Sequence, residues 1–260
     1  MNNNECLSFH PLSNRVLAFS STRHGGYGKG AYGSFNINPY VGDEEEAVQQ
    51  NIRLLCRHIA IEPSHLIFPH QTHETEIRVI GKEFLSLPPA TRAMILEGVD
   101  GLVTNIPNSC IGVSTADCIP ILLYDEAQHI GAAVHAGWRG TVKRIAEKAV
   151  QVMQTVYHTR SCDIKAYIGP GISVDNFEVG NEVYDQFAAA GFAMNEIARR
   201  EEKWHINLPE CNRLQLQAVG VLSENIAVSP ICTYQNVADY FSARQLGTAS
   251  GRIFTGIKLL

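Results

Sequence analysis

The chain has 260 residues, of which 45% are hydrophobic, and its 21 basic and 26 acidic residues give a formal net charge of −5. This composition is typical of a globular protein with a sizeable core and excludes a disordered chain. No basic run suited to neutralising phosphates occurs, and no apolar segment approaches the roughly 18 residues of a membrane span. We therefore expect neither a nucleic-acid partner nor a membrane partner.

The predicted elements alternate irregularly between helices and strands. Residues 43–60 have helical periodicity, a strand follows at 75–80, and a short helix or loop spans 84–98. Strands are predicted at 101–104, 110–114, 119–125 and 129–134, then a helix at 141–156. A strand at 163–169, helices at 180–190 and 210–222, and a strand at 252–260 complete the chain. This order favours a mixed α/β fold in one domain over residues 1–260.

The cysteines and the N-terminal residues indicate in which cellular compartment the protein is expected. The seven cysteines are odd in number and form no CxxC pair, which predicts a reducing environment rather than a disulfide framework. The stretch MNNNECLSFHPLSNR lacks the basic and apolar regions of a signal peptide. We expect a cytoplasmic protein.

Residues 115–141, TADCIPILLYDEAQHIGAAVHAGWRGT, predict a β-hairpin. Two apolar runs flank a three-residue connection, which indicates antiparallel pairing of Asp125 with His129. In that register Ile119 faces His135, and Cys118 lies just beyond. The hairpin therefore brings a thiol and an imidazole to the same open end.

A tight turn into a helix follows the hairpin. Gly137 and Gly140 flank Trp138 and Arg139, and the predicted helix begins near Thr141. A helix N-terminus presents unpaired N–H groups and a partial positive charge, so this turn with Arg139 is a candidate cradle for an anion or a substrate oxygen. The alternative is a plain chain turn in which Thr141 caps the helix.

The segment PHQTHET contributes His70 and His73. Two imidazoles and one thiolate would bind zinc and leave a fourth position for water or substrate, as in catalytic zinc sites. The residues do not form a compact finger pattern. Spacing alone therefore leaves hydrogen-bonded histidines and an inert buried thiol as the competing interpretation.

Several stretches together make the sequence recognisable. They are SSTRHGG at 20–26, SFNIN at 34–38, VGD at 41–43, HQTHETEI at 70–77, VDGLVT at 99–104, TADCIPILLYD at 115–125, AAVHAGWRGT at 132–141, IGPGI at 168–172, FEVG at 177–180, CTY at 232–234 and FSAR at 241–244. From about Leu17 onward the sequence resembles the laccase-domain family. Its members are also described as multicopper polyphenol oxidoreductases, peptidoglycan editing factors and zinc-dependent purine nucleoside phosphorylases.

The resemblance implies an α/β sandwich related to toxin-type cysteine deamidases. It places the zinc ligands on His73, Cys118 and His135, with copper as the alternative metal. It also implies phosphorolysis of adenosine, inosine, guanosine and methylthioadenosine, together with deamination of adenosine. A nucleoside and phosphate would then be the small-molecule partners.

Further residues are candidates for catalysis and substrate binding. Phosphorolysis requires phosphate to be held near the sugar, and Arg23, Arg139 and Arg244 are candidate contacts. Asn36, within SFNIN, is a fourth candidate substrate contact. Asp117, beside a ligand, would act as a general base or orient the site, or else would cap a turn.

The sequence departs from the family pattern at two places. Ile52 stands where the family often has Arg, and FSARQ at 241–245 replaces FSYRR. Both departures affect expected substrate contacts and leave the metal ligands unchanged. The ten histidines include no His-x-His pair, which argues against a four-copper oxidase despite one of the family's names.

Two other functions stay open on the sequence. In a cysteine hydrolase or amidase that edits peptidoglycan precursors, Cys118 would be the nucleophile and His135 its base. Zinc would mask the thiol, whereas a nucleophilic thiol is alkylated readily. A zinc-stabilised scaffold without catalysis is the third possibility, and the open fourth coordination position argues against it.

Overall fold

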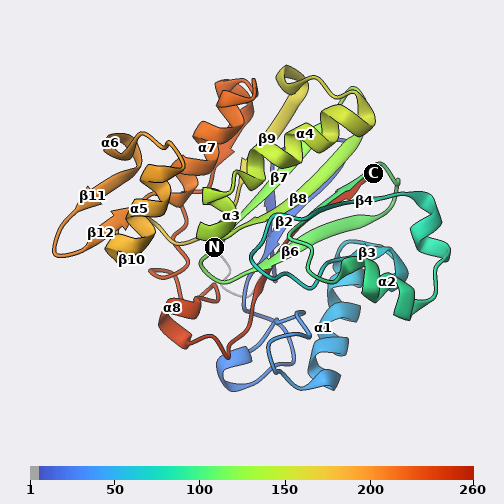
Figure 1. Ribbon diagram of the computed structural model, residues 1–260. Coiled ribbons are helices and arrows are strands. Elements are labelled where there is room, and N and C mark those ends of the chain that lie inside the picture. The colour runs from blue at the N-terminus through green and yellow to red at the C-terminus, as the bar shows by residue number, and fades with distance from the viewer. Residues whose placement is uncertain (1–5) are drawn as a thin grey trace.

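The computed structural model describes residues 6–260, which form two large β-sheets, one small sheet and eight α-helices (Figure 1). The six-stranded sheet has the order β13 (Ile226–Val228), β9 (Ile164–Ile168), β7 (Ile119–Asp125), β8 (Ile130–Ala136), β5 (Gly101–Thr104) and β4 (Ile77–Ile80). The five-stranded sheet has the order β1 (Leu7–His10), β2 (Val16–Ser21), β14 (Ile253–Leu259), β6 (Cys110–Thr115) and β3 (Leu66–Ile67). The small sheet has the order β10 (Glu178–Val179), β12 (Trp204–Ile206) and β11 (Ala198–Arg200).

The helices are α1 (Glu45–His58), α2 (Pro89–Leu96), α3 (Trp138–Val142), α4 (Ile145–Tyr157), α5 (Asn181–Ala189), α6 (Met194–Ile197), α7 (Leu208–Ala218) and α8 (Ala243–Leu246). Short 3-10 segments lie at Gly30–Tyr32, Pro63–His65, Lys82–Ser86, Ser161–Asp163 and Ser223–Asn225. Both large sheets mix strand directions: β4 with β5, β9 with β13 and β3 with β6 are parallel pairs, and the other pairs are antiparallel.

The two large sheets pack face to face between helical layers. Between them, Leu122 of β7 shares a core with Ile111 of β6 and Ile257 of β14. On the outer face of the six-stranded sheet, α4 and α7 pack against β7, β8 and β9. On the outer face of the five-stranded sheet, Leu55 of α1 packs with Phe19 of β2. In Figure 1, α4 and α1 accordingly lie on opposite sides of the sheets, which gives four layers.

Strands β7 and β8 lie at the centre of the sandwich, and every residue of both is buried. Alternate side chains point to opposite faces: Ile121 and Val134 face the helices, whereas Leu122 and Ala133 face the other sheet. Burial on both faces explains why these strands read as continuous apolar runs in the sequence.

The register of the β7–β8 hairpin differs from the expected one by one residue. Asp125 pairs with Ile130 rather than His129, and His135 faces Pro120 rather than Ile119. The Oδ1 atom of Asp125 accepts hydrogen bonds from two backbone N–H groups of the turn, and His129 has a φ of 56°. In this left-handed conformation His129 ends the turn instead of beginning the strand, so the connection has four residues.

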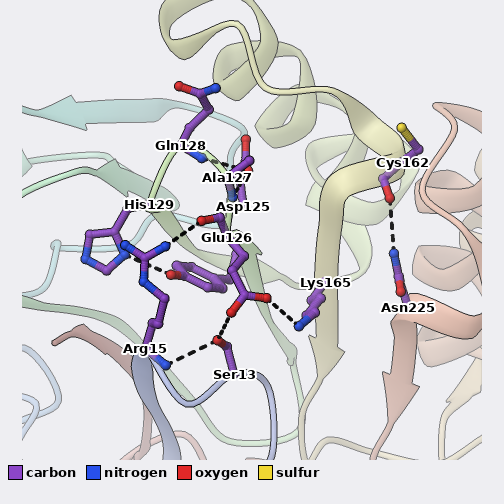
Figure 2. A network of polar contacts seen from close by, with 11 residues as sticks. Ser13, Arg15, Asp125, Glu126, Ala127, Gln128, His129, Cys162, Lys165 and Asn225 are labelled. Atoms are coloured by element: carbon purple, nitrogen blue, oxygen red, sulfur yellow. Dashed lines mark hydrogen bonds and ion pairs between the residues drawn. The ribbon is translucent and has the colours of Figure 1, made fainter.

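Side chains from other segments hold this turn in place, as Figure 2 shows. Arg15 donates from Nη1 to the carbonyl oxygen of Glu126 at 2.8 Å. The carboxylate of Glu126 accepts from the hydroxyl of Ser13 at 2.8 Å and from the ammonium of Lys165 at 2.7 Å. The hairpin tip is thereby tied to the start of β2 and to β9, which stabilises the four-residue connection.

The expected single helix at 141–156 is two helices, α3 and α4, separated at Arg144. This residue has a φ of 64°, and its guanidinium donates to the carbonyl oxygen of Ala190 at 2.9 Å while lying over the ring of Phe192. These tertiary contacts outweigh the local periodicity. The alternative in which Thr141 caps this helix is wrong, because Thr141 lies inside α3 and Gly137 is the N-cap.

The mixed α/β architecture predicted from the sequence is confirmed. The long central strands and the helices α1 and α5 lie within about two residues of their predicted positions, whereas α7 ends at Ala218, four residues before its predicted end. The strands β1, β3, β10, β11, β12 and β13 have two to four residues, too few for a detectable periodic signal, and the six-residue strand β2 was also missed. In the described part of the chain, no helix is long and apolar enough to cross a membrane.

Candidate metal centre

Three side chains from separate segments meet at one end of the sandwich. One ligand atom each from His73, Cys118 and His135 lies within 4.8 Å of the other two. His73 is exposed, Cys118 is half-buried and His135 is only 2% exposed. The structure thus brings together the three residues that the resemblance named as metal ligands.

The pairing of β7 with β8 places two of the three. His135 lies opposite Pro120 and has the same orientation as Ala133, which faces the space between the two sheets. Cys118 precedes β7 and by the same alternation also points to that side. Both side chains therefore reach the open end of the inter-sheet layer.

A buried carboxylate that the sequence analysis missed holds the third ligand. Asp100, fully buried, accepts backbone hydrogen bonds from Thr72, His73 and Glu74 at 3.3, 3.1 and 2.8 Å. These bonds support the left-handed backbone of His73, whose φ is 64°. The same carboxylate accepts from Nδ1 of His135 at 2.7 Å. The signal for Asp100 was a single acidic residue directly before the buried strand GLVT, within the matching stretch VDGLVT.

Gly137 leaves the space that the cluster occupies. A Cβ atom at this position would lie 3.1 Å from Sγ of Cys118 and 3.2 Å from Cδ2 of His73. Such contacts are tighter than ordinary van der Waals distances, so a side chain at this position would require Cys118 or His73 to shift by a few tenths of an ångström. Close packing against the cluster therefore favours glycine at position 137.

The cluster is strongly polarised. Burial alone would raise the pKa of the Cys118 thiol, but the charge and hydrogen bond of His135, and those of His73, lower it to about 6. Burial alone would lower the pKa of His135, but the Cys118 thiolate and the Asp100 carboxylate raise it to about 9. Without a metal, the cluster at neutral pH is a thiolate next to an imidazolium.

The donor set fits a mononuclear zinc site. Because Asp100 takes Nδ1 of His135, Nε2 is the nitrogen left for a metal, an arrangement typical of carboxylate–histidine–zinc sites. Two imidazoles and a thiolate are donors that zinc prefers. Within residues 6–260 this is the single group of three or more His, Cys, Asp or Glu side chains close enough to share an ion. That donor count does not suit a multinuclear copper cluster.

The carboxylate of Asp117 is fully engaged beside the cluster. Its Oδ1 accepts from the hydroxyl of Thr233 and its Oδ2 from the backbone N–H of Arg244, both at 2.7 Å. Asp117 has a φ of 85°, which is costly for a residue with a side chain. These contacts join the start of α8 to the residue next to Cys118.

A cavity of about 610 Å³ opens over the three ligands. Its lining includes His73, Cys118 and His135 at one end, the stacked rings of Tyr40 and His70 with centroids 4.0 Å apart, and Phe177. His70 is oriented by Glu97, both of whose carboxylate oxygens lie 2.9 Å from Nδ1. The cavity is within the size range of small-molecule sites.

The four candidate substrate contacts lie in different places. Arg244 lines the cavity, whereas the other three are not among its lining residues. Arg23 donates to the carbonyl oxygens of Gly33 and Val237, and the exposed Arg139 stacks on Trp138. Asn36 is fully buried and accepts from the backbone N–H of Arg252, which does line the cavity.

Comparison with known proteins places this arrangement in a family. The family model described as multi-copper polyphenol oxidoreductase laccase matches residues 17–260. The chain belongs to this laccase-like family. The predicted resemblance is thereby confirmed, and the copper chemistry in the description belongs to the family name.

Two curated relatives carry names of nucleoside enzymes. The purine nucleoside phosphorylase of Bacteroides thetaiotaomicron is 45% identical over 258 residues, which cover 97% of this chain and 96% of that protein. A protein named adenosine deaminase RL5, from an unknown prokaryotic organism, is 42% identical, with 97% of each chain covered. This laccase-like protein is therefore similar over nearly its whole length to enzymes that act on purine nucleosides.

Solved structures share the fold. YlmD from Geobacillus stearothermophilus superposes with a TM-score of 0.89 at 31% identity, over 96% of this chain and 94% of that one. YfiH from Bacillus licheniformis gives a TM-score of 0.92 at 26% identity, over 98% and 97% of the two chains. The mixed α/β sandwich is thus the fold of these neighbours.

Proposed function

We propose that this protein is a zinc-dependent enzyme that cleaves adenosine, inosine, guanosine and methylthioadenosine with phosphate and also deaminates adenosine. The observation that carries the proposal is the open group of His73, Cys118 and His135 at one end of a cavity large enough for a nucleoside. The relatives named purine nucleoside phosphorylase and adenosine deaminase support the choice of substrate. A reducing, cytoplasmic setting accords with the seven unpaired cysteines.

The chain's own residues supply the binding and orientation. Tyr40 and His70 form a flat aromatic wall of the cavity, against which a purine base can stack. Asp100 fixes the ring of His135 and the backbone of His73, so the ligands are in place before substrate arrives. A bound zinc ion would act as a Lewis acid or lower the pKa of a water molecule.

Metal analysis of the purified protein, combined with a nucleoside panel assayed with and without phosphate, tests this proposal. We expect about one zinc per chain and release of hypoxanthine from inosine that depends on phosphate. Release that occurs equally without phosphate would contradict phosphorolysis, and stoichiometric copper would contradict the choice of metal. Absence of turnover with every nucleoside would overturn the proposed substrate class.

A cysteine amidase is the second candidate, and Asp100 favours it. Cys118, His135 and Asp100 are arranged as nucleophile, base and orienting carboxylate, with the His135 to Asp100 contact at 2.7 Å. A peptidoglycan precursor bearing a wrongly incorporated amino acid would be the substrate. Activity that survives chelation and is lost on alkylation of Cys118 would support the amidase, whereas loss on chelation supports the zinc enzyme.

A further inference from the structure

Arg252 is a cavity residue outside every stretch that carries the family resemblance. It directly precedes β14, whose first residue, Ile253, pairs with Thr115 at the end of β6. Thr115 and Ala116 line the same cavity, so this sheet end and Arg252 form a wall continuous with the metal cluster. The backbone N–H of Arg252 is fixed by the side-chain oxygen of Asn36 at 3.1 Å.

The guanidinium of Arg252 is held by neutral groups alone. Nη1 donates to the carbonyl oxygens of Ser250 and Gly251 at 2.6 and 3.0 Å, and Nη2 donates to that of Thr248 at 2.8 Å. Over residues 6–260, no carboxylate lies within ion-pair distance of Arg252. The loop at 248–251 therefore orients the side chain through neutral groups, and the charges of Cys118 and Asp117, which line the same cavity, act on it only at longer range.

The remaining donors define a site. A guanidinium has five N–H groups, and the three carbonyl bonds leave the Nε–H and one Nη2–H without an acceptor in the described chain. Nε and Nη2 share one edge of the planar group, and when the Thr248 carbonyl accepts the other Nη2–H this edge matches two oxygens of a phosphate or carboxylate. We propose that this edge of Arg252 is the oxyanion subsite of the cavity and that it binds the inorganic phosphate consumed in phosphorolysis.

Arg244 is placed to assist on the same wall. Its backbone is anchored to Asp117, and its guanidinium makes one long hydrogen bond, 3.3 Å, to the carbonyl oxygen of Glu178 and lies over the ring of Phe177. Arg244 is exposed, whereas Arg252 is half-buried and already oriented. Less conformational entropy is therefore lost when Arg252 binds an anion, which makes it the principal contact.

The assignment of this subsite rests on the proposed function, in which phosphate is the nucleophile that cleaves the nucleoside. An oxygen of the bound phosphate forms a bond to C1′ of the ribose as the bond from C1′ to the purine nitrogen breaks. The purine leaves with that electron pair and takes up a proton from solvent. Deamination of adenosine consumes water instead of phosphate, so it does not require the Arg252 edge.

The contrast between these two reactions gives the experiment. The variants Arg252→Lys, which keeps the charge but loses the two-pronged edge, and Arg252→Gln are compared with wild type in the zinc-loaded protein. We expect KM for phosphate to rise by about tenfold or more, as loss of a charge-assisted hydrogen bond implies. The rise in KM for phosphate should exceed any change in KM for inosine or in kcat/KM for adenosine deamination. Arg53→Gln on the exposed face of α1 is the matched control and should leave all three constants within about twofold of wild type.

Direct titration of inorganic phosphate into wild-type protein gives a readout that needs no turnover. Binding that is weakened in Arg252→Lys supports the subsite even if no nucleoside is cleaved, so this inference and the proposed function can fail separately. An unchanged KM for phosphate in a folded variant overturns the inference. Absence of phosphate binding to the wild-type protein also overturns the inference. This measurement does not depend on whether the two variants fold.

Discussion

Nδ1 of His135 lies 2.7 Å from the carboxylate of Asp100, and the same carboxylate accepts the backbone N–H of His73. One buried group therefore orients two of the three candidate metal ligands. Hydrogen bonds to this carboxylate hold its pKa below the ordinary range against the opposing effect of burial, so it remains charged at neutral pH.

Replacing this carboxylate should weaken metal binding. In Asp100→Asn, an amide N–H would face backbone donors, and His135 would lose its anionic partner. We expect zinc affinity to fall by about 10- to 100-fold, measured by competition with a chromophoric chelator. Asp239→Asn is the matched control. The carboxylate of Asp239 likewise bonds to a histidine, His24, at 2.8 Å, but neither residue belongs to the cluster. Equal affinities in the two variants would contradict the orienting role.

Alkylation of the metal-free protein should have a distinctive pH profile. The pKa of Cys118 is lowered to about 6, so its reactive thiolate predominates above that pH and is lost below it. We expect the rate of modification by iodoacetamide at Cys118 to rise through pH 6 and then level off, as followed by peptide mass spectrometry. Bound zinc should protect Cys118 but not the exposed Cys162. Modification of Cys118 that is equally fast with zinc bound would count against ligation by this thiol.

Gly137→Ala should damage the site more than the fold. The added methyl group would lie 3.1 Å from Sγ of Cys118, so the ligands must shift. We expect zinc affinity to fall about tenfold or more while the melting temperature of the metal-free protein changes little. In Gly131→Ala, on strand β8, which ends just before Gly137, the methyl group would meet the side chain of Leu259 at the same distance. This control should affect stability and leave zinc affinity unchanged; the reverse pattern would refute the explanation.

Asp117 is expected to position the site rather than to act as a general base. Both of its oxygens are engaged, one by Thr233 and one by the Arg244 N–H. Asp117→Asn and Thr233→Val should each raise KM for the nucleoside. Both should also speed hydrogen–deuterium exchange at the Arg244 amide, because the hydrogen bond that protects this amide is weakened. The pH profile of kcat should keep its shape in both variants. Loss of one limb of that profile in Asp117→Asn alone would identify a general base.

The sequence predicts the central strands of the fold better than the short strands at the sheet edges. The runs that form β7 and β8 are long and apolar, so their pairing was predictable, and with it the meeting of Cys118 and His135. The register was wrong because His129 adopts a turn conformation that hydrophobicity does not encode. Strands of two or three residues are too short to show a periodic pattern, so the sequence did not predict β3 at one edge of the five-stranded sheet or any strand of the small sheet.

The candidate site was predictable only in part. His73 was selected by family resemblance, since nothing in its own segment links it to the hairpin. The role of Asp100 arises from contacts with His73 and His135, which are distant in the chain, and its local signal was a single acidic residue before a buried strand. The guanidinium of Arg252 is oriented by its own loop, but its place at the cavity depends on the pairing of β14 with β6. Arg139 illustrates the opposite error: it stands in a distinctive motif, yet its side chain stacks on Trp138 outside the cavity lining.

The three candidate ligands come from segments that are far apart in the chain, and this bears on whether folding or metal binding happens first. An unfolded chain holds His73, Cys118 and His135 far apart, and none of the three belongs to the apolar clusters that form the four-layer core. Folding should therefore come first and metal capture second. For the zinc enzyme proposed above, a shortage of zinc in the cell would then leave an intact, inactive form, which newly available metal could activate without new protein synthesis.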